Sequence, residues 1–173
     1  MKFIFILLLV IATNLFSATY NAPSQEYHGI AEREYKWMLR NNDIKVNIAV
    51  SDDAKTFFTE DSLLRYFKLK LRGFLNKKNI QTEFPKNQMD YQYLGLKLEL
   101  YKYNNKLNIY FGFIEMSLLS SIYEKGCPRM YQIIIPIAGS ENQIIGFVKQ
   151  DIDSIVEKFA EDYFYIEDLV KNK

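Results

Sequence analysis

Four carboxylates near the stretch IKVNIAVSDD have residue types that could do chemistry: Asp52, Asp53, Glu60 and Asp61. Carboxylate oxygens bind hard cations, and two carboxyl groups together can act as an acid and a base. The calcium-loop pattern of alternating acidic ligands around a central Gly is absent, however. Asp52 and Asp53 end an alternating strand, and a helix that begins after Thr59 would place the other two in its first turn, where negative charge is favourable. The sequence therefore favours a structural role and predicts no metal or cofactor.

Few residues of the sequence could serve as the nucleophile or the base of a common hydrolase. His28 is the single histidine, and a Ser-His-Asp or Cys-His site would have to use it, although the part of the mature chain around it is expected to be the least ordered. Cys127 is the single cysteine, in a turn with Gly126 and Pro128, and cannot form an internal disulfide. In an oxidising compartment it is a candidate for a disulfide to another chain. No P-loop, dinucleotide-binding glycine run or nucleophile elbow occurs.

A second acidic group lies near the C-terminus. Glu157, Glu161 and Asp162 are expected on the polar side of the last helix. Paired carboxylates there could support a hydrolase, but helix surfaces are commonly acidic, and solvated side chains are the favoured interpretation.

The most concentrated charge lies on the helix expected after Thr59, whose polar side carries Arg65, Lys68, Lys70, Arg72, Lys77 and Lys78. A solvated face is the favoured interpretation. The functional alternatives are an anionic lipid headgroup, a lipopolysaccharide phosphate or an acidic partner. Arg65, Lys68 and Arg72 are the candidate anion-binding residues.

The N-terminal stretch MKFIFILLLVIATNLFSA predicts a secretory signal peptide over 1–18, because a short positive start precedes an apolar run and small residues. An uncleaved anchor is the alternative, and the absence of a nearby Cys excludes a lipoprotein anchor. Without these residues the chain has equal numbers of basic and acidic side chains, so charge gives no reason to expect nucleic acid binding. Export with a single cysteine indicates the periplasm of a Gram-negative bacterium, with no transmembrane segment in the mature chain.

The remaining chain predicts an α+β fold, with a mainly antiparallel sheet and helices packed on one face. We expect a lead and a helix in 19–43, the helix itself over 27–40, then one α+β domain over 44–173. Apolar periodicity predicts strands at 44–50, 80–84 and 130–139, a last short strand at 144–148, and a helix over 151–170. Pro136 indicates an edge position or a bulge.

A long hairpin is expected between 93 and 113, with its turn at Asn104 and Asn105. Its predicted register pairs Leu100 with Ile109, Leu98 with Phe111, and Leu96 with Phe113, which places these six side chains on the core face. The other face would then carry Tyr101, Glu99, Lys97, Asn108 and Tyr110. Tyr101 and Tyr110 are therefore candidate contact residues.

The C-terminal segment DIDSIVEKFAEDYFYIE resembles the end of a loose group of uncharacterised Gram-negative periplasmic α/β proteins, which finish with a helix of the type lv-x-x-F-x-x-DYL-x-x-N. Val156, Phe159, Asp162 and Tyr163 match that motif, whereas Phe164 replaces Leu and no Asn closes it. The start of the domain is also similar to small domains of envelope-assembly proteins, so that the resemblance covers 44–167. It implies a non-catalytic envelope protein.

Three functions follow, in order of preference. The first is a periplasmic module that binds an envelope protein or a lipid-linked component through exposed sheet edges and the Tyr-rich face. The second is a small-ligand or polysaccharide binder with a pocket between the sheet and the last helix, where Trp37, Tyr101 and Tyr110 could stack on sugars. The third is a carboxylate-dependent hydrolase.

Overall fold

The computed structural model describes residues 19–21, 35–40, 42–76, 78–82, 92–104, 108–120 and 130–172. The strands are β1 (Thr19–Asn21), β2 (Asp43–Val50), β3 (Asn79–Gln81), β4 (Gln92–Asn104), β5 (Ile109–Ser120) and β6 (Met130–Ser140). The helices are η2 (Lys36–Leu39), η3 (Ala54–Thr56), α3 (Glu60–Phe74) and α4 (Glu141–Lys171).

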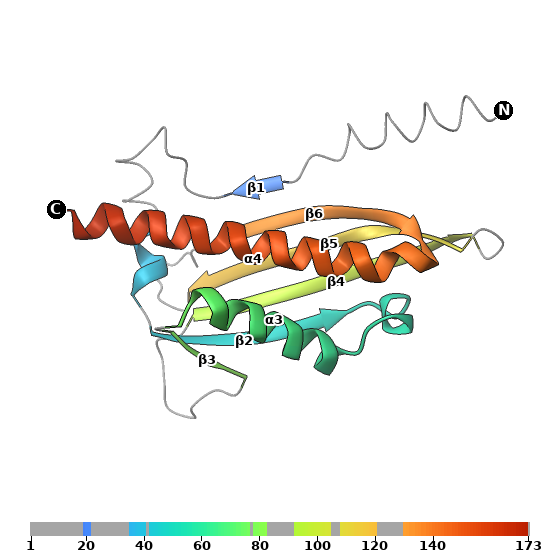
Figure 1. The fold of residues 1–173 in the computed structure, drawn as a ribbon, viewed down its shortest axis with the longest axis horizontal. Helices are drawn as coiled ribbons and strands as arrows, with labels where there is room; N and C mark the ends of the chain where they lie inside the picture. Colours follow the sequence, from blue (N-terminus) through green and yellow to red (C-terminus); the bar gives the residue numbers. More distant parts are fainter. Residues whose placement is uncertain are drawn as a thin grey trace.

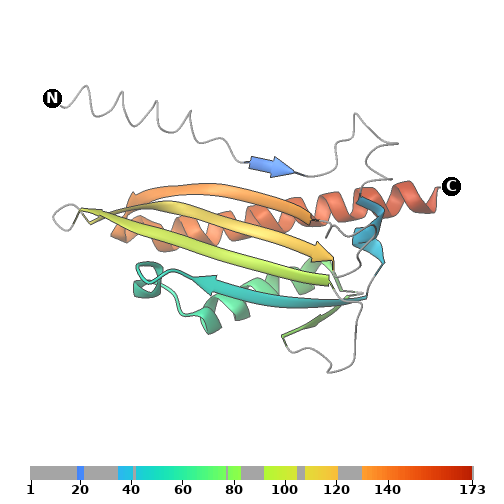
Figure 2. The ribbon, with the colours of Figure 1, turned by 180° about the vertical axis from the view of Figure 1, so that it is seen from behind.

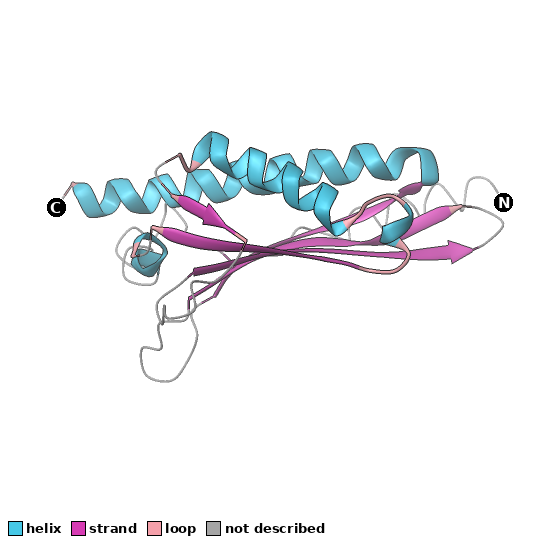
Figure 3. Ribbon diagram, turned by 90° about the horizontal axis from the view of Figure 1, so that it is seen from below, coloured by secondary structure: helices cyan, strands magenta, loops and turns pink. Residues whose placement is uncertain are grey.

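The six strands form one sheet in the order β1-β6-β5-β4-β2-β3. β4, β5, β6 and β1 pair antiparallel in succession, whereas β2 runs parallel to both β3 and β4. Both α-helices lie on the same side of this sheet, as the edge-on view shows (Figure 1, Figure 3). The predicted α+β fold with helices on one face is thus confirmed.

α3 begins where the sequence predicts. Thr59 caps it, with its Oγ1 accepting a hydrogen bond from the Ser62 amide at 3.1 Å, while the Ser62 Oγ accepts one from the Thr59 amide at 3.1 Å. This reciprocal pair satisfies two amides that the helix itself leaves unpaired. Leu63, Phe67 and Leu71 form its buried side.

α4 is longer than predicted, because residues 144–148 are not a strand. They form the early turns of this helix, which starts at the Ser140 cap. Ile144, Val148 and Ile152 are each fully buried at intervals of one helical turn, so they continue the apolar side of the helix expected over 151–170. A short apolar run such as IIGFV fits a strand or a helix equally well by pattern, which explains the error.

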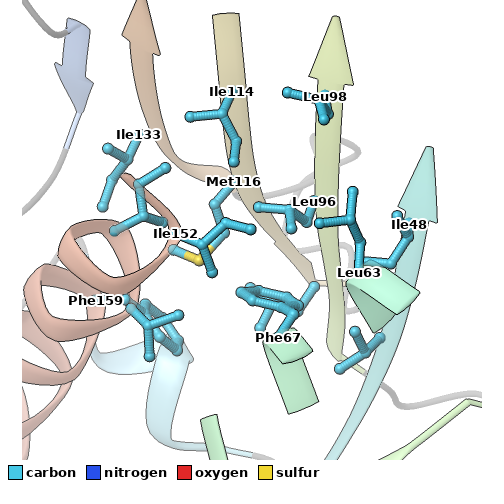
Figure 4. Packing of buried hydrophobic residues seen from close by; sticks show 14 of the residues in the cluster. Ile48, Leu63, Phe67, Leu96, Leu98, Ile114, Met116, Ile133, Ile152 and Phe159 are labelled. Atoms are coloured by element: carbon cyan, nitrogen blue, oxygen red, sulfur yellow. The ribbon is translucent and has the colours of Figure 1, made fainter. Parts of the chain in front are cut away.

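The core lies between the sheet and the two helices (Figure 4). Leu96 and Leu98 of β4 and Ile114 and Met116 of β5 point into it, and Phe67 of α3 meets them from the helix side. Further labelled residues come from β2, β6, α3 and α4: Ile48, Ile133, Leu63, Ile152 and Phe159. The single core thus joins both helices to four strands.

Pro136 is predicted to mark an edge position or a bulge, and in the sheet order β6 lies between β1 and β5. β1 pairs with β6 only from Gln132 to Ile134, and Pro136 lies beyond it, opposite Phe113 of β5. Proline lacks a backbone donor, so it makes a sheet edge a poorer template for another strand.

The predicted helix over 27–40 and the predicted strand over 80–84 fall partly outside the described residues. Of the first, the structure gives the 3-10 helix η2, in which Trp37 and Met38 are buried. Of the second, it gives β3, which ends at Gln81.

We expect Gly146→Ala to stabilise the protein by about 1 kcal/mol, because glycine is costly inside a helix. Gly146 lies within α4, and a Cβ there would meet nothing within 4 Å. Urea denaturation would measure the change. Gly139→Ala is the contrasting variant, because its Cβ would lie 2.9 Å from Cε2 of Phe147, and it should not stabilise. An equal gain from both variants would contradict the explanation.

Candidate binding surface

The face of the sheet opposite the helices is open to solvent in the described part of the chain. It is turned toward the viewer in Figure 2, with the helices behind it. Side chains alternate along β4, so that Leu98 and Leu100 point into the core while Lys97, Glu99 and Tyr101 point to this face. Any partner that approaches from this side meets strand side chains directly.

Three large aromatic side chains gather at one end of the open face. Tyr101 is 48% exposed, Tyr103 66% and Phe111 46%. Tyr101 is paired directly with Phe111 across β4 and β5, and their ring centroids lie 5.7 Å apart. Tyr103 meets the Phe111 ring edge-on at 6.4 Å. We call these three residues the aromatic cluster. Its rings contact one another and still expose a large apolar area to water.

The polar side chains beside the aromatic cluster neutralise one another. Lys97 Nζ lies 2.8 Å from Oε1 of Glu99, and the Tyr101 hydroxyl donates to Oε2 of Glu99 at 3.2 Å. The hydrogen bond from Lys97 lowers the pKa of Glu99 below its ordinary value. Lys97 also lies 5.6 Å from the centre of the Phe113 ring. The apolar cluster is therefore bordered by the ion pair between Lys97 and Glu99.

A recess of about 420 Å³ adjoins the aromatic cluster at the end of β2. Its lining residues are Val50, Ser51, Asp52, Asp53, Glu99, Leu100 and Tyr101. Tyr101 thus belongs to both the recess and the cluster, which makes one continuous surface of them.

The carboxylates of this recess already have structural partners. Asp53 accepts a hydrogen bond from the Lys102 amide at 2.8 Å, and Asp52 forms a 2.9 Å ion pair with Lys55. The bond from Lys55 lowers the pKa of Asp52. Ser51 Oγ accepts from the Leu100 amide at 2.9 Å. These contacts attach the end of β2 to β4, and within the described ranges no three His, Cys, Asp or Glu side chains are grouped to hold a metal.

The structure corrects the position of Tyr110, one of the predicted contact residues. Tyr110 is only 4% exposed and lies in the core, where its ring meets Phe57 edge-on at 4.8 Å. Trp37 is likewise buried, at 3% exposure. Neither ring is available for stacking on a sugar, and of the predicted aromatic residues Tyr101 alone reaches the surface.

The reason for the error is the hairpin register. Leu100 faces Gly112, Leu98 faces Ile114 and Leu96 faces Met116, which is three residues away from the predicted pairing along β5. An odd shift moves every side chain of β5 to the opposite face. Phe111, predicted in the core, therefore becomes part of the aromatic cluster.

The pocket expected between the sheet and the last helix stays a prediction, whereas a groove of about 270 Å³ lies between the two helices. It is lined by Leu69, Lys70, Gly73, Phe74, Asp153 and Glu157. Asp153 joins the helices here, since it accepts hydrogen bonds from the Tyr66 hydroxyl and from Lys70 Nζ, both at 2.8 Å. Its polar contacts are thus occupied within the fold.

The other predicted site residues are placed as follows. Arg65 and Arg72 are exposed on α3, and Lys68 is partly exposed. Cys127 and His28 lie outside the described residues. Asp162, predicted on the polar side of α4, is instead buried at 4% exposure.

Comparisons with known proteins assign no family. No family model matches the chain, and no curated protein matches it. Among solved structures, an uncharacterised protein is similar with a TM-score of 0.44 and 9% identity, over 70% of this chain and 91% of that one. A minor lipoprotein from Acinetobacter baumannii is similar with a TM-score of 0.33 and 16% identity, over 69% and 88% of the two chains. Similarity at this level assigns no function to the chain.

In the part of the chain that the structure describes, no helix is both long and apolar enough to cross a membrane.

Proposed function

We propose that the protein is a non-catalytic module of the Gram-negative envelope, exported to the periplasm, which binds another envelope protein through the open face of its sheet. The observation that carries this proposal is the aromatic cluster, which leaves three large rings exposed on a face that no described helix covers. The N-terminal apolar stretch of the sequence supports export.

A partner that covers the aromatic cluster removes apolar surface from water. Burying apolar surface contributes about 25 cal/mol per Å², and exposed aromatic side chains are enriched among the residues that dominate protein interfaces. The neighbouring Lys97 and Glu99 are already paired 2.8 Å apart, so a partner need not neutralise either of these two charges to cover the cluster. A partner with an apolar patch of its own fits this surface best.

A glycan is the second candidate ligand, favoured by the recess of about 420 Å³ that Tyr101 shares with the cluster. Aromatic rings beside hydroxyl and carboxylate groups, here Ser51 and Glu99, can stack on a sugar and accept its hydrogen bonds. A polysaccharide that binds only the folded protein would raise its melting temperature. A shift that survives Tyr101→Ser would exclude this recess as its site.

We expect Tyr101→Ser with Phe111→Ser to reduce recovery of the partner by about ten-fold or more, because interface aromatics carry a large share of binding energy. The measurement is crosslinking of the tagged full-length protein in living cells, followed by mass spectrometry of the envelope fraction. The same spectra locate the N-terminus of the exported chain.

The matched control is Ile145→Ser with Phe164→Ser, which removes two apolar side chains of similar exposure, 43% and 41%, from the helix side. It should leave recovery unchanged. Recovery of the same partner by the Tyr101 and Phe111 variant would show that the open face is not the interface.

A further inference from the structure

α3 carries three cations on the side turned away from the core. Arg65, Lys68 and Arg72 recur at positions i, i+3 and i+7, which places them in one row along the helix. We call them the basic stripe. The buried side chains of α3 are Leu63, Phe67 and Leu71, which occupy the opposite side. The stripe therefore faces solvent and supports nothing within the fold.

The charges of the basic stripe are unused. Within the ranges that the structure describes, none of the three forms an ion pair or a hydrogen bond through its side chain. Lys70, on the side of α3 that faces α4, differs because it is paired with Asp153 at 2.8 Å. The acidic residues of α3, Glu60 and Asp61, lie in its first turn, so the charged side chains of its later turns are all basic.

An apolar side chain projects from the same surface. Leu69 is 68% exposed, the highest value among the large hydrophobic residues that the structure describes, and it lines the groove between α3 and α4. Phe74, five residues further along α3, lines the same groove and is 37% exposed. Leu69 has the basic stripe on one side and the groove residues Lys70, Asp153 and Glu157 on the other. Cations beside a projecting apolar residue are typical of surfaces that rest on lipid headgroups and insert a side chain below them.

We propose that the basic stripe docks on an anionic lipid surface, with Leu69 entering the boundary between headgroups and acyl chains. Charge complementarity selects an anionic partner, and the projecting Leu69 favours lipid over an acidic protein. The apolar stretch at the start of the sequence brings the chain to a membrane, whether that stretch is removed or retained.

The placement of α3 makes this contact compatible with the rest of the molecule. α3 and the open face lie on opposite sides of the sheet (Figure 3). With α3 against lipid, the aromatic cluster points away from the membrane. Docking on lipid and binding a protein partner therefore use different surfaces, and either can be lost without the other.

The test is co-sedimentation of the protein purified from exporting cells with two kinds of vesicle, phosphatidylcholine alone and phosphatidylcholine with phosphatidylglycerol. We expect preferential binding to the anionic vesicles that weakens as salt is added. Each cation near such a surface contributes about five-fold in binding, so Arg65→Gln with Arg72→Gln should weaken it by about 25-fold. Leu69→Ser should weaken it by about five-fold without affecting the fold.

The control is Lys36→Gln with Lys149→Gln, which removes the same charge from two exposed lysines elsewhere. It should change binding by less than about two-fold. Equal losses from both pairs would overturn the proposal, because overall charge would then explain binding. Equal binding to both vesicle types would also overturn it, since a retained apolar N-terminus behaves that way. Binding to polyglutamate but not to vesicles would overturn it in favour of an acidic protein.

Discussion

Gly112→Ala is expected to destabilise the protein by at least about 3 kcal/mol, enough to prevent folding of a marginally stable domain. Gly112 lies in β5, in the middle of the sheet, opposite Leu100 of β4 and Ile137 of β6. A Cβ at this position would overlap the carbonyl oxygen of Glu99 and lie 2.8 Å from its carbon. These are backbone atoms, so no side chain can move to relieve the overlap, and β4 and β5 would have to separate.

The measurement is urea denaturation followed by circular dichroism, with expression yield as a second readout. Gly95→Ala is the control because it lies on the same hairpin, where a Cβ would meet Ser117 Oγ and Tyr93 Cε1 at 3.4 Å, an ordinary contact. It should change stability by less than about 1 kcal/mol. If both variants fold with the stability of the native chain, the close approach of β4 and β5 at Gly112 is not required.

The same glycine explains why the hairpin register was predicted wrongly. The predicted register maximises the number of apolar cross-strand pairs in the hairpin, and it places Ile109, Phe111 and Phe113 on the core face. That face would have continued into Glu115 and Ser117, which are polar. The true core face of β5 runs through Gly112 to Ile114 and Met116, and a glycine adds no apolar side chain to the count. The alternation of polar and apolar residues after residue 113 indicates the correct core face of β5.

Patterns within one element were predicted well, and contacts between distant elements were not. The alternation in β2 and the Thr59 cap of α3 depend on neighbouring residues, and both are confirmed. The candidate surface depends on which face of β5 is covered, and this follows from pairing with β4, β6 and the helices. For that reason the prediction of an exposed Tyr101 is confirmed, whereas the prediction of an exposed Tyr110 is wrong, because Tyr110 is buried in the core.

Asp162 shows the same limit in a charged residue. Helix surfaces are commonly acidic, so a solvated position is expected for it from the sequence. The structure buries it against Tyr131 of β6, whose hydroxyl donates to Oδ2 of Asp162 at 2.8 Å. Lys158 Nζ lies 3.4 Å from the other carboxylate oxygen. Since Tyr131 is distant in sequence, only the packing of α4 on β6 brings this partner to the carboxylate.

Asp162 is expected to make stability depend on pH. Burial raises its pKa from 3.8 to about 7, because the charged form loses its hydration. A carboxyl with a raised pKa in the folded state contributes stability that is fully present below the unfolded pKa. That stability is lost as the pH rises toward the folded pKa. Between about pH 4 and about pH 7 the loss is of the order of 2 to 4 kcal/mol, with the lower value applying where Lys158 offsets burial.

Asp162→Asn should remove this dependence, because the amide keeps the shape and the acceptor for Tyr131 but carries no charge. We expect the variant to gain stability relative to the native chain between about pH 5 and about pH 8, by roughly 2 kcal/mol or more. Urea denaturation at the two pH values would measure the difference. Tyr131→Phe should increase the loss of stability between about pH 5 and about pH 8. Removal of the hydroxyl donor destabilises the charged carboxylate more than the neutral acid.

The control is Asp168→Asn, which removes an exposed carboxylate from the same helix and should leave the pH dependence of the native chain unchanged. If the stability of Asp162→Asn instead changed with pH as that of the native chain does, Lys158 and the Tyr131 hydroxyl would be sufficient to keep Asp162 charged in the folded state. Asp162 and the partly exposed Lys158 would then stay ionised over this pH range. The comparison therefore decides whether burial or Lys158 controls the protonation of the one aspartate buried between α4 and β6 in the described chain.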